Sequence, residues 1–189
     1  RLTVAEIDPM VTALARSQMW FTPGPNTRIK AQDARVALAN EPAGERFDII
    51  FGDAFHDIAV PAHLLSAEFH QIVRARLTRP GFYVVNVVDN PRQPRLLASL
   101  VRTLRQHFET IEVWVAPDHV RGASRATFIV YAAASATGLP DTVKASHGYP
   151  NSWRRVRIDS LNVAQLGLTL TDDFTPIDRL LSTFWFFGD

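Results

Sequence analysis

The sequence predicts an α/β fold in which a doubly wound, mainly parallel sheet carries helices on both faces. Segments of strand composition alternate with segments of helical apolar spacing along the chain. Residues 81–88 are almost continuously apolar, which is typical of a parallel strand whose two faces are both covered. The length of 189 residues suits one such domain with a small appendage. We expect residues 1–135 to form this domain and residues 136–189 to form a C-terminal extension packed on it.

The first part of the chain shows the alternation most simply. Residues 2–7 are expected to be a buried strand, and Pro9 suits the first turn of the helix that follows. The cluster of turn-forming residues at 22–26 ends this unit. A short strand over residues 28–31 and a helix that begins near Val36 come next.

The middle of the chain repeats the pattern with longer elements. Apolar residues at helical spacing follow Ser66, whose side chain can cap the helix, and Pro80-Gly81 is expected to end it. The remaining expected elements are strands over residues 47–51, 81–88, 111–115 and 127–131 and helices over residues 96–108 and within 172–181. The strands at 111–115 and 127–131 are expected to pair with each other.

Composition and charge exclude several classes of protein. A net charge of +1 gives no basis for a nucleic-acid partner, and the chain has no cysteine for a disulfide, a thiolate metal site or a nucleophile. His56, His63 and His70 do not have the spacing of a common zinc motif, so we expect no metal. No apolar run approaches the roughly 20 residues of a membrane helix, and we expect the protein to be cytoplasmic. The closing residues 184–187 are expected to be a packed terminus or an association patch.

Acidic residues follow three of the predicted strands. Glu6 and Asp8 follow the first, Asp33 follows the second, and Asp53 and Asp57 follow the third. Ligands of doubly wound sheets bind outside the carboxyl ends of the strands. Three acidic strand ends in register would line a crevice suited to ribose hydroxyls, an adenine amino group and a cationic substrate.

Each acid also has a purely structural interpretation. Glu6 fits a solvated turn, Asp33 fits the cap of the following helix, and Asp53 fits a cap or an Asx turn. Asp172 and Asp173 are expected to cap the last helix. These alternatives stay open at the level of sequence.

Five segments together resemble the spermidine synthase (polyamine aminopropyltransferase) family, which has the Rossmann-like class I methyltransferase fold. They are VAEIDPMV, QDAR, FDIIFGDAF, PAHLLSAEFHQIVRARLTRPGFYVVNV and LTDDFTPIDRLL. Their order covers most of the chain. The resemblance implies that the first strand of the fold and its Gly-rich loop precede Arg1 and are absent from this sequence.

The resemblance also implies roles for individual residues. Glu6 matches the acid that binds the ribose hydroxyls of decarboxylated S-adenosylmethionine, and Asp33 and Ala34 match the segment that contacts adenine. Asp53 matches the catalytic aspartate, and Asp57 is the nearest candidate for the aspartate that binds the amine. No covalently bound cofactor is implied.

Three functional hypotheses follow. The leading one is an aminopropyltransferase that uses decarboxylated S-adenosylmethionine and a small polyamine, with no nucleic-acid partner and with a homodimer as an open alternative. The second is an S-adenosylmethionine-dependent methyltransferase on the same fold. The third is a non-catalytic nucleoside-binding or interaction domain.

Overall fold

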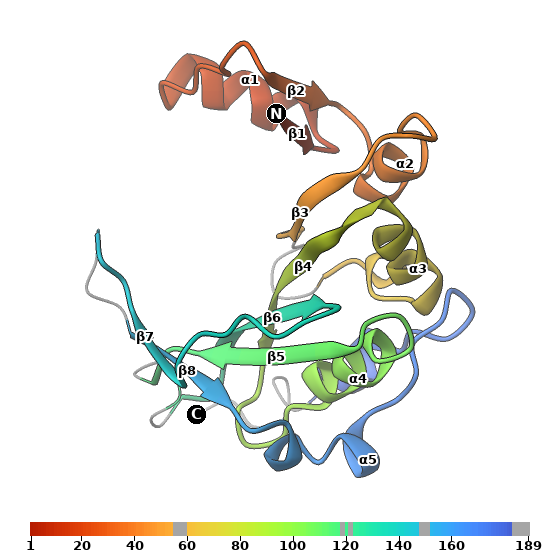
Figure 1. The fold of residues 1–189 in the computed structure, drawn as a ribbon, viewed down its shortest axis with the longest axis vertical. Coiled ribbons are helices and arrows are strands. Elements are labelled where there is room, and N and C mark those ends of the chain that lie inside the picture. Colours follow the sequence, from red (N-terminus) through yellow and green to blue (C-terminus); the bar gives the residue numbers. More distant parts are fainter. Residues whose placement is uncertain (55–59, 118–119, 121–122, 148–151, 183–189) are drawn as a thin grey trace. The chain divides into compact units, whose positions relative to one another are not determined.

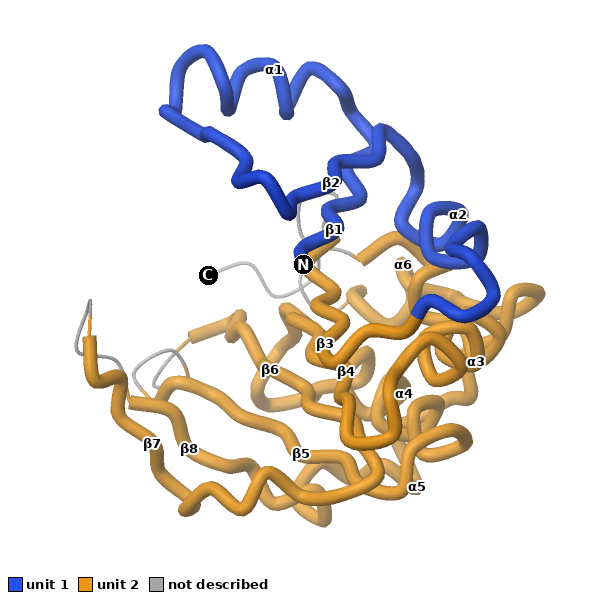
Figure 2. The backbone as a smooth tube through the Cα atoms, turned by 45° about the horizontal axis from the view of Figure 1, so that its top comes forward, with its two compact units in different colours: residues 1–45 blue, residues 46–189 orange. Residues whose placement is uncertain are grey.

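A computed structural model describes residues 1–54, 60–117, 120, 123–147 and 152–182. The chain divides into two compact units, Arg1–Glu45 and Arg46–Asp189, which Figure 2 shows in different colours.

The first unit contains two strands and two helices. They are β1 (Leu2–Ala5), α1 (Pro9–Gln18), β2 (Thr27–Lys30) and α2 (Ala34–Ala39). The strands β1 and β2 pair in parallel as a two-stranded sheet (Figure 1), with Ala5 opposite Lys30 at its carboxyl end. Pro9 begins α1 as predicted, and the Asp8 carboxylate caps the helix by accepting a hydrogen bond from the Met10 backbone N–H at 2.8 Å.

The buried Glu41 connects β2 to the segment after α2. Its carboxylate accepts a charged hydrogen bond from Lys30 Nζ at 2.9 Å and another from Arg28 at 3.1 Å. Burial acts to raise the pKa of Glu41, but the hydrogen bond and charge of Lys30 and the charge of Arg28 outweigh it and lower this pKa. The ionised form of Glu41 therefore stabilises the unit above its unfolded pKa, and this contribution is lost as the pH falls through the folded pKa.

The second unit is built around a six-stranded sheet in the order β3-β4-β6-β5-β8-β7. The strands are β3 (Phe47–Gly52), β4 (Leu77–Asp89), β5 (Thr110–Val115), β6 (Ala126–Ala133), β7 (Thr142–Lys144) and β8 (Ser152–Val156). β3 and β4 are parallel, as predicted, whereas the other pairings are antiparallel. The expected pairing of the strands near residues 111–115 and 127–131 is confirmed as β5 with β6.

Helices contribute further residues to the core of this unit. They are α3 (Ala67–Arg76), α4 (Arg95–Leu104), α5 (Val163–Leu166) and α6 (Ile177–Leu180), with short 3₁₀ helices η1 (Ala62–Leu64) and η3 (Ile158–Leu161). Ser66 caps α3 as predicted, accepting from the Phe69 N–H at 3.2 Å. Both α3 and α4 contact β4. Residues of β4 are alternately buried and half-buried, rather than continuously buried as the apolar run suggested, because the two faces are unequally covered within this unit.

The junction of α3 and β4 differs from the prediction. We expected a strand from Gly81, but β4 begins at Leu77, directly after α3, and its pairing with β3 is irregular between Phe47 and Ile49. A Cβ atom at Gly81 would lie 2.9 Å from the backbone oxygens of Phe47 and Asp48. Glycine therefore permits the close approach of the two strands here, and Pro80 lies within the irregular part of the strand.

The C-terminal part packs on α4 through buried hydroxyl groups. Thr103 Oγ1 accepts from the Leu170 N–H at 3.0 Å, and Ser99 Oγ accepts from the Leu168 N–H at 3.0 Å. The Arg102 guanidinium donates to the Gly167 carbonyl at 3.0 Å. These contacts fix residues 167–170 against a helix in which eight of ten residues are buried.

One further prediction needs correction. The last helix begins after Pro176 without a side-chain cap, so Asp172 and Asp173 do not cap it. Asp172 instead donates its backbone N–H to Glu68 at 3.0 Å. No helix in the described part of the chain is long and apolar enough to cross a membrane.

Candidate functional site

Asp53 lies directly after β3, at the carboxyl end of a parallel strand. Gly52 is paired with Val85 of β4, and this register brings the next residue, Asp53, beside Asn86. The Asn86 side-chain Nδ2 donates a hydrogen bond of 2.7 Å to Asp53 Oδ1. The Asp53 carboxylate is exposed, whereas Asn86 is half-buried in the sheet. The strand therefore presents an oriented carboxylate to solvent at the position predicted from sequence.

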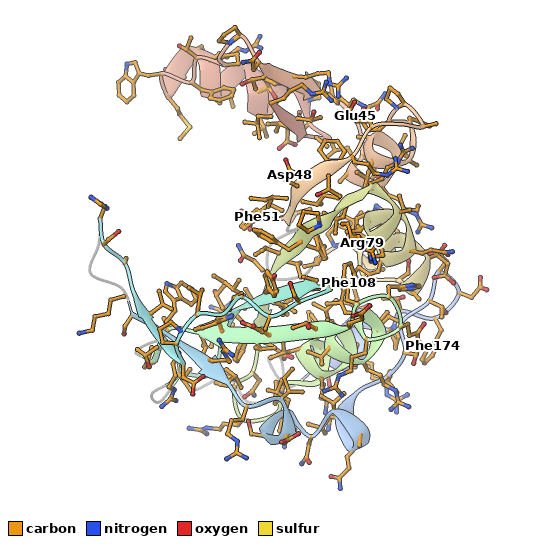
Figure 3. All side chains as sticks on the ribbon, in the orientation of Figure 1. Glu45, Asp48, Phe51, Arg79, Phe108 and Phe174 are labelled. Atoms are coloured by element: carbon orange, nitrogen blue, oxygen red, sulfur yellow. The ribbon has the colours of Figure 1, made fainter. Side chains whose placement is uncertain are left out.

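A second aspartate on β3 provides a comparison. Asp48 lies near the start of the strand, and its Oδ1 accepts a hydrogen bond of 3.1 Å from Thr78 of β4. Figure 3 shows Asp48 and Phe51 projecting from β3. β4 side chains thus donate hydrogen bonds to Asp48 on β3 and to Asp53 directly after it, but only Asp53 is at the end where ligands of such sheets bind.

Glu6 and Asp8 follow β1 in the first unit. The Glu6 backbone N–H continues the pairing with β2 by donating to the Lys30 carbonyl at 3.0 Å. One carboxylate oxygen of Glu6 accepts from the Asp8 N–H at 2.9 Å, which orients this half-buried side chain. Asp8 itself is occupied in capping α1.

Asp33 and Ala34 follow β2 in the same unit. Asp33 Oδ1 accepts from the Val36 N–H at 3.0 Å, so the residue is the cap of α2, as its structural interpretation predicted. Because β1 and β2 are parallel neighbours, Glu6 and Asp33 both follow the carboxyl end of the two-stranded sheet. Both residues therefore follow the strand ends outside which ligands of such sheets bind.

Asp57 and His56 lie outside the described residues. The chain continues at Val60, and residues 60–62 line a cavity of about 500 Å³ together with residues 175–179. Those last residues belong to the LTDDFTPIDRLL segment. Residues 175–179 therefore lie beside residues 60–62.

Asp89 is a buried carboxylate that the sequence analysis did not consider. It ends β4, and its two oxygens accept from the backbone N–H groups of Asn90 at 2.7 Å and Leu97 at 2.8 Å. Burial raises the pKa of Asp89 to about 7, against the lowering effect of these hydrogen bonds. Asp89 connects the end of β4 to the first turn of α4.

No group of three or more potential metal ligands is found among the described residues. His70 is fully buried on α3 between the rings of Phe69 and Tyr83. Both of its ring nitrogens lack hydrogen-bond partners among the described residues. Burial, with a smaller contribution from the charge of His107, lowers the pKa of His70 to about 3, so it is a neutral core residue.

The polar contact of Asn86 with Asp53 was also missed by the sequence analysis. The sequence did contain a signal for this contact. Apart from Tyr83 with its phenol group, Asn86 is the one polar residue in the apolar run 82–88. Recognising its partner required the register of β3 against β4, which the sequence does not specify.

Comparison with known proteins relates the chain to a group of transferases. No protein-family model matches it. A polyamine aminopropyltransferase of Vibrio vulnificus is 35% identical over 92 residues, which are 48% of this chain and 31% of that protein. Over this part the chain is similar to polyamine aminopropyltransferases. A probable polyamine aminopropyl transferase of Bifidobacterium longum is 34% identical over 86 residues, or 46% of this chain and 18% of that protein. This relationship confirms the resemblance seen in the sequence.

Solved structures confirm the class I methyltransferase fold of this chain. A probable spermidine synthase from Corynebacterium glutamicum matches 87% of the chain with a TM-score of 0.69 at 19% identity, over 61% of its own length. Human methyltransferase-like protein 13, solved in complex with SAH, matches 95% of the chain with a TM-score of 0.58 at 18% identity, over 70% of its length. The chain thus spans about a third or less of the curated relatives and under two thirds of the first structure.

Proposed function

We propose that this chain is part of an aminopropyltransferase that moves an aminopropyl group from decarboxylated S-adenosylmethionine to a polyamine. The observation that carries the proposal is the match of 92 residues, at 35% identity, to a polyamine aminopropyltransferase. The oriented carboxylate of Asp53 at the carboxyl end of β3 supports it. A spermidine synthase solved with the transition-state analogue AdoDATO has the same fold, with a TM-score of 0.55 at 15% identity.

The proposed reaction is a displacement at a carbon attached to a sulfonium. The amine nitrogen of the acceptor attacks this carbon with its lone pair, the carbon–sulfur bond breaks, and its electrons stay on sulfur as the thioether of methylthioadenosine. The attacking amine must be neutral, so one proton has to leave it. A carboxylate within hydrogen-bonding distance of the amine can accept that proton.

The chain offers residues for each part of this reaction. In the proposal, Asp53 is the general base, and Asp57 binds the far ammonium group of the polyamine. Glu6 binds the ribose hydroxyls of the donor, and Asp33 with Ala34 contacts the adenine. The oriented Glu6 carboxylate supports its role, since its second oxygen does not take part in the contact with Asp8. No covalently bound cofactor is needed, and a homodimer is compatible with this scheme.

The deciding experiment measures product formation by the full-length protein. Decarboxylated S-adenosylmethionine and S-adenosylmethionine are each supplied with putrescine and with longer diamines, and the products are separated by chromatography. The proposal predicts methylthioadenosine and an aminopropylated amine from the first donor only. Methyl transfer from the second donor would indicate a methyltransferase. Binding of methylthioadenosine without product from either donor would indicate a non-catalytic nucleoside-binding domain.

A further inference from the structure

Asn86 occupies a position where the neighbouring residues are apolar. Its flanking residues on β4 are Val85 and Val87, which are almost fully buried, and Val84 and Val88 are the nearest residues on its own face of the strand. On the opposite side of β4 it is paired with Ile129 of β6. A valine at residue 86 would fit this environment and the high β propensity of the strand.

The amide of Asn86 is only partly satisfied. Nδ2 donates to Asp53 at 2.7 Å, but Oδ1 is buried and has no hydrogen-bond partner among the described residues. Turning the amide over would place Oδ1 against the carboxylate oxygen, where two acceptors repel each other. Within the described residues this unpaired acceptor lowers stability, so an apolar side chain would suit the position better.

We infer that Asn86 is a positioning residue that fixes the Asp53 carboxylate for proton transfer from the acceptor amine. This inference rests on the proposed function. The donor at Nδ2 occupies one carboxylate oxygen, Oδ1, and restricts rotation of the carboxylate plane. Oδ2 is then the oxygen that accepts the proton of the amine. A general base that rotates freely lowers turnover, because a carboxylate misplaced by about 1 Å can reduce turnover roughly 100-fold.

The test replaces Asn86 with valine in the full-length protein and compares turnover with stability. Asn86→Val should lower kcat about 10- to 100-fold with little change in the KM of the sulfonium donor. The melting temperature should stay the same or rise, because the unpaired Oδ1 is removed. A structural role predicts the reverse, with a lower melting temperature and unchanged kcat. Thr78→Val is the matched control, since it removes the hydrogen bond from β4 to Asp48 on β3 and should leave kcat unchanged.

Two further measurements separate positioning from structure. Asn86→Asp keeps the shape but places two carboxylates in contact, so the acid limb of the kcat–pH profile should move to higher pH. In the double variant Asp53→Asn with Asn86→Val, kcat should fall no further than in Asp53→Asn alone, because Asn86 acts through Asp53.

The positioning role of Asn86 and the proposed function can fail separately in these experiments. Aminopropyl transfer by the wild type together with an unchanged kcat in Asn86→Val would overturn the positioning role alone. Fully multiplicative losses in the double variant would also overturn it. Absence of transfer by the wild type would overturn the proposed function, and the positioning role with it.

Discussion

Among single residues, Asp53 has the most direct link to chemistry. Asp53→Asn keeps the size and shape of the side chain but removes its ability to accept the amine proton. We expect turnover to fall by about 100-fold or more, with little change in methylthioadenosine affinity or in thermal stability. Steady-state kinetics and calorimetry measure the two effects. Asp48→Asn, on the same strand, is the control and should leave turnover within about twofold of the wild type; an equal loss in both variants would indicate a general effect on β3.

Glu6 permits a test of donor binding that does not depend on catalysis. A carboxylate that accepts from two ribose hydroxyls contributes about 1.5–3 kcal/mol per hydrogen bond. Glu6→Ala should therefore weaken methylthioadenosine binding at least about tenfold in calorimetry on the full-length protein. The exposed Glu109 gives a control of equal charge change, since Glu109→Ala should not alter the affinity. Unchanged binding by the Glu6 variant would remove this residue from the site.

His70 makes the stability of the second unit depend on pH. Its pKa is lowered from 6.5 to about 3 in the folded state, so between these values only the unfolded chain takes up the proton. Stability therefore falls as the pH decreases from about 6.5 toward 3, by at most about 1.4 kcal/mol per pH unit. His70→Phe keeps an aromatic ring and should lose this dependence.

Denaturant unfolding of wild type and His70→Phe between pH 4 and pH 8 tests the expectation. Below about pH 6.5, the unfolding free energy of the wild type should fall relative to that of His70→Phe. Asp89 acts in the opposite direction, because its raised pKa of about 7 makes stability fall as the pH rises from about 4 to 7. That contribution is common to both proteins and cancels in the difference. A difference that is constant with pH would show that His70 titrates normally.

At the scale of elements, the contact of residues 167–170 with α4 depends on two hydroxyl groups. Thr103→Val is nearly isosteric but leaves the buried N–H of Leu170 without its acceptor. We expect a loss of about 1–3 kcal/mol in unfolding free energy, measured by chemical denaturation, and a smaller loss for Ser99→Ala, since Leu168 is only partly buried. The exposed Thr142 on β7 gives the control, because Thr142→Val should change stability by less than about 0.5 kcal/mol. Equal stability of the Thr103 variant and the control would contradict this.

The elements differ in how far their sequence determines them. Apolar periodicity and capping residues are local signals. They predicted the strands at 47–51 and 81–88 and the helices that follow Ser66 and begin at Pro9. The start of β4 was missed because the approach of Gly81 to the Phe47 carbonyl is a contact between two strands. β7 and β8 were missed as well, since neither has a strong apolar pattern. The position of Asp53 could be predicted from the strand that precedes it. Its contact with Asn86 could not, because it depends on the register of β3 against β4.

At the scale of the whole chain, the two units differ in their cores. Among the described residues 1–45, Ala37 is the single buried apolar residue, while Leu2, Ile7, Met10, Leu14 and Trp20 are exposed. A unit that buries so little apolar surface gains too little free energy to offset the entropy of an ordered chain. The second unit contains the six-stranded sheet and all the other buried apolar residues described.

This difference predicts the behaviour of the two units when they are produced separately. A fragment of residues 46–189 should show a cooperative thermal transition by circular dichroism. A fragment of residues 1–45 should be unfolded, with narrow amide dispersion in its NMR spectrum. A folded N-terminal fragment would contradict the argument, as would a C-terminal fragment without a cooperative transition.

The hydrogen bonds of residues 167–172 also have a consequence for the order of events during synthesis. The first N–H of α3, at Ala67, donates to the Leu170 carbonyl at 2.8 Å, and Glu68 accepts from the Asp172 N–H, 104 residues later in the chain. A ribosome therefore makes α3 and α4 long before the residues that complete their hydrogen bonding. Contacts of such separation form late, because a long loop must be closed first. Until residue 172 has left the ribosome, the N–H of Ala67 on α3 and the hydroxyl groups of Ser99 and Thr103 on α4 lack their partners from residues 168–170. A chaperone that binds incompletely folded chains would act at this stage.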